Sequence, residues 1–185
     1  YVVTAYHSKN YTAQLNSFSF RCAVSNGDVY DWDAVFSGNI VTASLPESAD
    51  LTALKPAFSV SDNATVTVNG IVQTSGESAQ NFSGSLVYKV TAEDGVVSKS
   101  YTVTVIKKRL EYVYLPAYGV AGYSVDTSSG ELTAVPGSPF FTGMAAGGMT
   151  SSPDGRFAYV ANRDAKSITA VTVNMKTGAL TSLPA

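Results

Sequence analysis

The sequence predicts an all-β fold in two parts, and three observations support this prediction. Thr, Ser, Val, Tyr, Ala and Gly dominate the composition, whereas the helix formers Lys, Glu and Leu are sparse. Apolar and polar residues alternate with a period of two in several segments. These segments are separated by Gly, Pro, Asn-Gly or Asp-Gly. The last 76 residues contain a sequence that occurs twice. We therefore expect antiparallel sheets, first in a sandwich and then in repeated units.

The first predicted strands lie between residues 16 and 46. Phe18 and Phe20 alternate with serines and an arginine, so both rings are expected on one face of a strand. The segment 39–45 alternates in the same way, and Pro46 ends it because proline cannot donate to a strand ladder. The shared face of this second strand comprises Val41, Ala43 and Leu45.

Residues 51–72 combine two patterns. Leu51 and Leu54 are three residues apart, a spacing compatible with a single helical turn before Pro56. The segment 64–68 alternates as a strand does, and 71–72 begin the return strand. Asn69 and Gly70 form the reversal between them, because both residues tolerate a positive φ.

The clearest predicted hairpin covers residues 85–108. Asp94-Gly95 makes its reversal. A slip of one residue would expose every apolar side chain of the inward face, so the register should be well specified. That face comprises Leu86, Tyr88, Val90 and Ala92 on the first strand and Tyr101, Val103 and Val105 on the second.

Three consecutive basic residues, Lys107 to Arg109, follow this hairpin and mark a change in composition. We interpret them as a solvated junction between two domains, 1–108 and 109–185. The first domain then has about 100 residues, which is a common size for an antiparallel sandwich.

The second domain begins with the repeat. In its two copies Val113-Tyr114-Leu115 matches Ala158-Tyr159-Val160, Val120–Asp126 matches Ile168–Asn174, and Gly130–Thr133 matches Gly178–Thr181, with a three-residue gap in the middle. Short strands repeated at this period are typical of β-propeller blades. A propeller needs about four to eight blades, so we expect a truncated propeller of fewer than two blades, whose functional surface lies mostly beyond this chain. Its open strand edges predict that this segment pairs with the sandwich or, in self-association, with another molecule, or is less well ordered than residues 11–107.

Residues 11–107 resemble a bacterial Ig-like or cadherin-like module that occurs in tandem on envelope and secreted proteins. The resemblance rests on "NSFSF", on "GNIVTASLPESADLTALKPAFSVSDNATVTVNG" and on "VYKVTAEDGVVSKSYTVTV", in that order. It implies an Ig-like sandwich that serves as a spacer or adhesion module and carries no catalytic residue.

Residues 110–185 resemble the lactonase-type β-propeller family, which includes enzymes similar to 6-phosphogluconolactonase. The resemblance rests on Pro153-Asp154-Gly155, Ala158–Asn162 and Thr177–Thr181, together with the connector Gly137–Phe140. These residues are turns and strand cores. The resemblance therefore implies the propeller fold and assigns no catalytic residue.

The composition argues against several functions. A net charge of −2 with 14% charged residues provides no electrostatic footprint for nucleic acid or an anionic membrane. No apolar run approaches the roughly 18 residues of a membrane-spanning helix. Cys22 is the single cysteine, so no intrachain disulfide is possible. His7 is the single histidine, which argues against a His/Cys metal site or a Ser/His/Asp triad. We expect no catalytic residue and no cofactor in this chain.

The candidate metal site is a group of three carboxylates, Asp28, Asp31 and Asp33. Closely spaced carboxylates can bind Ca²⁺, which takes six to eight oxygen ligands. The segment lacks the Gly and the distal Glu of a calcium loop, and Trp32 interrupts its polarity. We therefore prefer solvated turn carboxylates and keep weak calcium binding as the alternative.

Three functions remain open. The preferred one is a bacterial cell-envelope or secreted protein, with the sandwich as spacer or adhesion module and the propeller as an interaction platform for a protein or carbohydrate ligand. The second is a lactonase-class hydrolase that acts on a sugar lactone or ester and has its active site in later blades. The third is a purely structural repeat protein.

Overall fold

A computed structural model describes residues 9–25, 27–143 and 145–184. Within these ranges every regular element is a β-strand, no helix is present and no sheet closes into a barrel. The all-β class predicted from the sequence is confirmed. Internal contacts divide the chain into an N-terminal unit (up to residue 22, 29–45 and 49–107) and a C-terminal unit (23–28, 46–48 and from 108).

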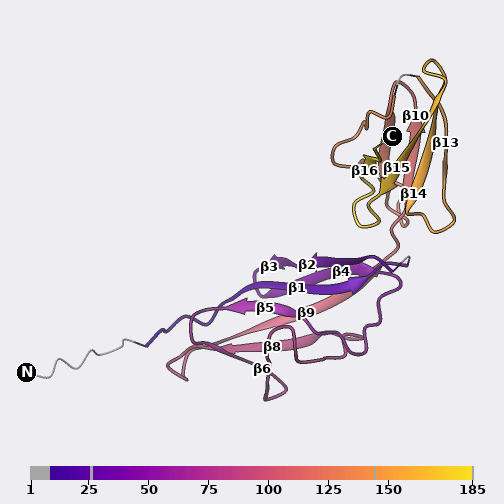
Figure 1. Cartoon of the computed structure of the whole chain (residues 1–185). Coiled ribbons are helices and arrows are strands. Elements are labelled where there is room, and N and C mark those ends of the chain that lie inside the picture. The colour runs from indigo at the N-terminus through magenta and orange to yellow at the C-terminus, as the bar shows by residue number, and fades with distance from the viewer. Residues whose placement is uncertain (1–8, 26, 144, 185) are drawn as a thin grey trace, which may run out of the picture. The chain divides into compact units, whose positions relative to one another are not determined.

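The N-terminal unit consists of two sheets (Figure 1). One has the strand order β2-β1-β5 and the other β3-β4-β9-β8-β6-β7. The strands are β1 (Leu15–Ala23), β2 (Val29–Asp33), β3 (Val35–Ser37), β4 (Ile40–Pro46), β5 (Ala57–Val60), β6 (Thr65–Val68), β7 (Ile71–Val72), β8 (Leu86–Thr91) and β9 (Ser98–Lys108).

Aromatic side chains from both sheets form the core of the N-terminal unit. Phe18 of β1 and Tyr88 of β8 meet edge to face, with ring centroids 5.1 Å apart. The ring centroid of Phe82, in the loop before β8, lies 4.9 Å from that of Phe20, and all four rings are buried. Burial also raises the pKa of Tyr88, because an apolar environment disfavours the phenolate. The two sheets therefore face each other across an apolar, aromatic layer.

The alternation in the sequence correctly predicted the inward faces of these strands. The β8–β9 hairpin pairs Tyr88 with Tyr101 and Leu86 with Val103. Asn69 and the glycine after it both have a positive φ, as the predicted turn requires. The predicted inward residues Val41, Ala43, Leu45, Val90, Val103 and Val105 are all buried, whereas Leu86 is only partly buried. Val66 and Val68 of β6 are buried as well.

The single helical turn suggested for residues 51–54 is absent, and that prediction was wrong. Leu54 instead forms an isolated β-bridge with Gln80, with backbone N–O distances of 3.0 and 2.9 Å. The Asp50 carboxylate accepts hydrogen bonds from the amide and the hydroxyl of Thr52. This side chain-to-backbone bonding favours a turn over a helix.

The C-terminal unit contains two antiparallel sheets (Figure 1). We call the sheet in the order β10-β11-β12 the first repeat sheet and the sheet in the order β13-β14-β15-β16 the second repeat sheet. Their strands are β10 (Tyr112–Pro116), β11 (Val120–Val125), β12 (Leu132–Ala134), β13 (Ala146–Ser151), β14 (Phe157–Asn162), β15 (Ser167–Val173) and β16 (Leu180–Ser182).

Strand pairing confirms the sequence repeat residue by residue. Tyr114 pairs with Gly122 in the first repeat sheet, and its counterpart Tyr159 pairs with Ala170 in the second. Val125 pairs with Leu132, and their counterparts Val173 and Leu180 pair in the same way. The two copies are therefore equivalent in three dimensions as well as in sequence.

One strand was missed by the sequence reasoning. The sequence patterns predicted no strand here, yet β13 begins at Ala146 and pairs with β14. Its glycines have low strand propensity, so the composition gave no strand signal. Backbone hydrogen bonds to β14 form this strand instead.

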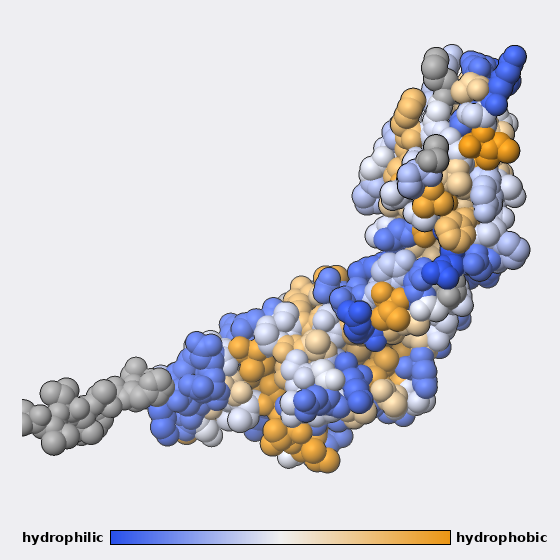
Figure 2. Space-filling view, in the orientation of Figure 1, coloured by the Kyte–Doolittle hydropathy of each residue, from blue (hydrophilic) through white to orange (hydrophobic). Residues whose placement is uncertain are grey.

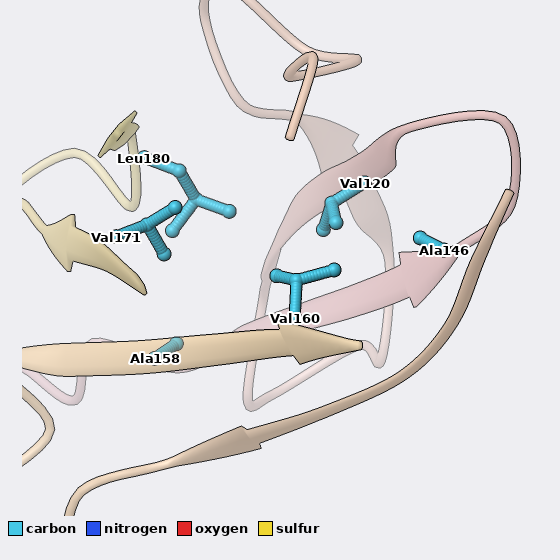
Figure 3. Packing of buried hydrophobic residues seen from close by; sticks show 6 residues of the cluster. All are labelled: Val120, Ala146, Ala158, Val160, Val171 and Leu180. Atoms are coloured by element: carbon cyan, nitrogen blue, oxygen red, sulfur yellow. The ribbon is translucent and has the colours of Figure 1, made fainter. Parts of the chain in front are cut away.

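The two repeat sheets pack face to face. Figure 3 shows the Val120 side chain of the first sheet close to Val160 of the second, and both are completely buried. The hydroxyl of Tyr112 donates to the Lys176 carbonyl at 2.7 Å, and that of Tyr114 donates to the Gly178 carbonyl at 2.6 Å. The shared apolar cluster comprises Val120, Ala146, Ala158, Val160, Val171 and Leu180.

Candidate functional site

Turns gather at one end of the two repeat sheets and enclose a hollow of about 260 Å³. The β10–β11 turn, the start of β13 and the β14–β15 turn contribute its walls. We call it the Tyr118 hollow; it is lined by Ala117, Tyr118, Ala145, Ala146, Gly147, Arg163 and Asp164.

Tyr118 is the most exposed large apolar side chain among the described residues, at 89%. It lies at the tip of the turn between β10 and β11, which closes through a hydrogen bond from Ala117 N to Gly119 O at 2.7 Å. The strand after the turn is fixed by paired backbone hydrogen bonds of 2.8 Å between Val120 and Phe140. A rigid turn thus presents a solvated aromatic ring at the mouth of the hollow.

Charged groups also line the hollow. The Arg163 amide donates to the Ala145 carbonyl at 3.0 Å, which ties the β14–β15 turn to the start of β13. The Arg163 side chain makes an ion pair with Asp164, with Nε and Oδ1 3.3 Å apart. Both side chains are exposed, so the pair contributes little to stability. The guanidinium and the carboxylate remain accessible to a ligand.

A second hollow, of about 750 Å³, shares Arg163 with the Tyr118 hollow and includes Asn162 in its wall. Asn162 is buried and donates from Nδ2 to the Thr169 hydroxyl at 2.8 Å. Thr169 in turn donates to the Thr142 carbonyl at 2.5 Å. This chain of hydrogen bonds fixes the turn that carries Arg163. Within the described residues, the buried Oδ1 of Asn162 accepts no hydrogen bond.

The arrangement is suited to binding a polar ligand that has an apolar face. The face of a tyrosine ring carries partial negative charge and attracts weakly positive C–H groups. Arg163 supplies planar donors, and Asp164 supplies acceptors. A hollow with one aromatic wall and a few convergent polar groups is the usual form of a small-ligand site.

The structure places the predicted calcium candidates on and just before β2. Asp31 and Asp33 are exposed on the face of β2 opposite the buried Trp32. Asp31 forms an ion pair with Arg21, with an N–O distance of 3.3 Å. Asp28 precedes the strand. In the part of the chain that the structure describes, no group of three or more His, Cys, Asp or Glu side chains lies close enough to hold a metal ion.

We expect calcium to leave the N-terminal unit unchanged. Adding Ca²⁺ or EDTA should not shift its Tm, because exposed carboxylates on a strand lack the convergent oxygen ligands that Ca²⁺ needs. Differential scanning calorimetry checks this expectation. A rise in Tm with Ca²⁺ that disappears in an Asp31→Asn/Asp33→Asn variant would establish the calcium alternative, since a ligand stabilises the state that binds it.

Two further residues were considered from the sequence, the single cysteine, Cys22, and the single histidine, His7. Cys22 lies on β1 and is partly buried, and burial raises the pKa of its thiol as expected for an unreactive side chain. His7 lies outside the described residues.

Sequence reasoning missed Tyr118, Arg163 and Asp164. The usable signal was the three-residue gap in the repeat, because it falls in the β10–β11 and β14–β15 turns. Turns that differ between copies of the same scaffold are where function is most often placed. The residues that match between the copies define the strands of the scaffold and do not include these turns.

Residues 26–105 match the family described as "SGBP, N-terminal", the N-terminal region of surface glycan-binding proteins. The match lies largely in the N-terminal unit and covers less than half of the chain. It confirms the predicted location: this is a bacterial cell-surface or secreted protein. No curated protein matches the sequence at a significant level.

Three solved structures that are similar to the chain come from Bacteroides. A proposed glycoside hydrolase from B. thetaiotaomicron shares 20% identity over 92% of this chain and 48% of its own, with a TM-score of 0.43. A proposed secreted protein from B. fragilis shares 18% identity over 52% of this chain and 96% of its own, with a TM-score of 0.37. A proposed 6-phosphogluconolactonase from B. fragilis shares 24% identity over 57% of this chain and 33% of its own, with a TM-score of 0.36. The chain thus spans about half the length of the first of these proteins.

Among the described residues, no helix has the length and hydrophobicity required to cross a membrane.

Proposed function

We propose that the protein binds glycans at the bacterial cell surface or after secretion, with the N-terminal unit as a spacer and the C-terminal unit as the binding platform. The family match of residues 26–105 supports the ligand class. The single observation that carries the site assignment is the solvated Tyr118 ring beside Arg163 and Asp164. Pyranose rings have a C–H face and a rim of hydroxyl groups, which suit an aromatic ring and planar polar side chains respectively.

The distribution of aromatic side chains supports this division of roles. Within the described ranges, three of the four exposed large aromatic residues belong to the C-terminal unit, namely Tyr118, Phe141 and Tyr159. Tyr11, just before β1, is the fourth. The N-terminal unit uses its other large aromatic side chains mainly to fill its core, as expected of a spacer with a rigid fold.

The finer architecture is part of the proposal. We propose that the N-terminal unit is an Ig-like sandwich, with its boundary near residue 108, and that the C-terminal unit is a segment of a lactonase-type propeller. The two facing sheets of the N-terminal unit support the first assignment. The equivalent repeat sheets of the C-terminal unit support the second.

Replacing Tyr118 by alanine should weaken glycan binding by about tenfold or more, because removing an aromatic anchor from a binding site commonly costs about 2 kcal/mol. A glycan array identifies a ligand, and isothermal titration calorimetry then compares the variant with wild type. Tyr11→Ala is the matched control, since it removes another exposed tyrosine, from the N-terminal unit.

Two results would contradict the proposal. Equal loss of binding in Tyr11→Ala and Tyr118→Ala would place the ligand away from the Tyr118 hollow. Turnover of a sugar lactone by the full-length protein would favour the hydrolase alternative, whose active site is expected in later blades, so the full-length protein is assayed for lactone hydrolysis.

A further inference from the structure

Very small residues form a large part of the wall of the Tyr118 hollow. Beside Tyr118, Arg163 and Asp164, the lining consists of three alanines and a glycine, namely Ala117, Ala145, Ala146 and Gly147. The volume of about 260 Å³ lies just below the about 300–1,000 Å³ of pockets for drug-sized ligands, so the hollow suits a single sugar residue. A wall of alanine methyl groups is apolar and suits a small apolar substituent on that sugar.

Ala145 has a backbone conformation that is unfavourable for a residue with a side chain. Its φ is 54°, in the left-handed region that glycine adopts without steric cost. The Arg163 amide holds it in place by donating to the Ala145 carbonyl at 3.0 Å. Backbone strain that the surrounding structure maintains is concentrated at ligand sites. We therefore interpret the Ala145 methyl group as a ligand contact, because glycine would satisfy the backbone alone.

The charged groups of the hollow balance each other. Arg163 and Asp164 are adjacent in the sequence, and their side chains pair with Nε and Oδ1 3.3 Å apart. One cation and one anion give no net preference for a charged sugar, whereas together they offer a donor beside an acceptor. The visible surface of this unit likewise mixes hydrophobic and hydrophilic residues (Figure 2). A neutral group that contains both a donor and an acceptor fits this pair.

We propose that the sugar residue bound in the Tyr118 hollow is an N-acetylhexosamine. Its acetamido group combines an N–H donor, a carbonyl acceptor and a methyl group. The Asp164 carboxylate accepts from the N–H and the Arg163 guanidinium donates to the carbonyl, while the methyl group contacts the alanine wall and the pyranose ring stacks on Tyr118. This inference rests on the proposed glycan-binding function and names the class of sugar that the site selects.

Matched sugars test the inference on the whole chain by isothermal titration calorimetry and saturation-transfer-difference NMR. N-acetylglucosamine and N-acetylgalactosamine are compared with glucose and galactose, which carry a hydroxyl at the same position, and with glucosamine and galactosamine, which carry an ammonium. At least one N-acetylhexosamine should bind about tenfold more tightly than both of its analogues, because only the acetamido group occupies the polar pair and the apolar wall together. Its methyl protons should receive the strongest saturation.

Two variants separate the polar and the apolar contact. Asp164→Ala should reduce the preference for the N-acetyl sugar by about tenfold and leave the Tm unchanged, because an exposed ion pair contributes little to stability. Ala145→Gly should reduce it by about threefold without lowering the Tm, because glycine relieves the strain of the positive φ. Ala165→Gly, the same substitution in the β14–β15 turn but outside the lining of the hollow, should leave the preference unchanged.

The outcomes separate this inference from the proposed function. Glycan binding that depends on Tyr118 but shows no preference for the N-acetyl sugars would overturn the inference and leave the proposed function intact. A preference that survives both Asp164→Ala and Ala145→Gly would also overturn it, since the acetamido group would then be bound elsewhere. A chain that binds no glycan would overturn both.

Discussion

Replacing Phe18 by alanine is expected to lower the free energy of unfolding of the N-terminal unit by about 3–5 kcal/mol. The Phe18 ring is buried and contacts four other aromatic rings, those of Phe20, Phe58, Phe82 and Tyr88. Their ring centroids lie 5.4, 6.1, 6.5 and 5.1 Å away, respectively. These rings come from both sheets and cannot all move into the space, so the substitution leaves a cavity. The loss is large beside the about 5–15 kcal/mol that stabilises a typical domain.

Urea unfolding followed by tryptophan fluorescence measures this effect, because the single tryptophan, Trp32, is buried on β2 of the same unit. Val96→Ala is the control, because that exposed side chain should change stability by no more than about 0.5 kcal/mol. A loss below about 1 kcal/mol in Phe18→Ala would show that the aromatic layer does not hold the two sheets together.

Replacing Gly178 by alanine should destabilise the C-terminal unit by about 2–5 kcal/mol. The added Cβ would lie 2.3 Å from the Tyr112 ring, and overpacking of this kind costs about 1–3 kcal/mol. The positive φ of 76° adds about 1–2 kcal/mol for a residue with a side chain. Moving the ring would also break the hydrogen bond from the Tyr112 hydroxyl to the Lys176 carbonyl.

The repeat supplies a matched control for this substitution. Gly130→Ala introduces the same side chain at the same φ with no neighbour within 4 Å, so it should lose only the about 1–2 kcal/mol of backbone strain. Hydrogen exchange of the β10, β11, β14 and β15 amides reports the stability of this unit, which has no tryptophan. Equal losses in both variants would mean that contact with Tyr112 does not hold the two repeat sheets together.

Most of the scaffold was predictable from local patterns. The alternation at Phe18 and Phe20, the Asn69-Gly70 and Asp94-Gly95 turns and the repeated strands are all signals carried by neighbouring residues, and pairing confirmed them. The predictions that went wrong had the same cause. Leu51 and Leu54 matched a local helical spacing, but the segment bonds to Gln80, which is distant in sequence. β13 has no local signal, because its pairing with β14 forms it.

The gap in the repeat marks the turns that carry the candidate site, but the site itself was not predictable, because it depends on which turns come together. Tyr118 and Arg163 are 45 residues apart in the sequence, and neither belongs to a recognisable motif. They share a hollow because equivalent turns of two stacked sheets lie at the same end. The sequence contained the residues and the repeat, but their meeting follows from how the sheets stack.

Period-two patterns and turn residues were enough to predict the all-β class, the inward faces of the strands and the equivalence of the two repeats. Which apolar residues stay exposed depends instead on how the sheets pack. Val120 and Ile168 occupy equivalent positions in the repeat and are both apolar, yet one is buried and the other is open to solvent. A strand residue is buried where a second sheet covers its face, and in this chain each repeat sheet is covered by the other on one face.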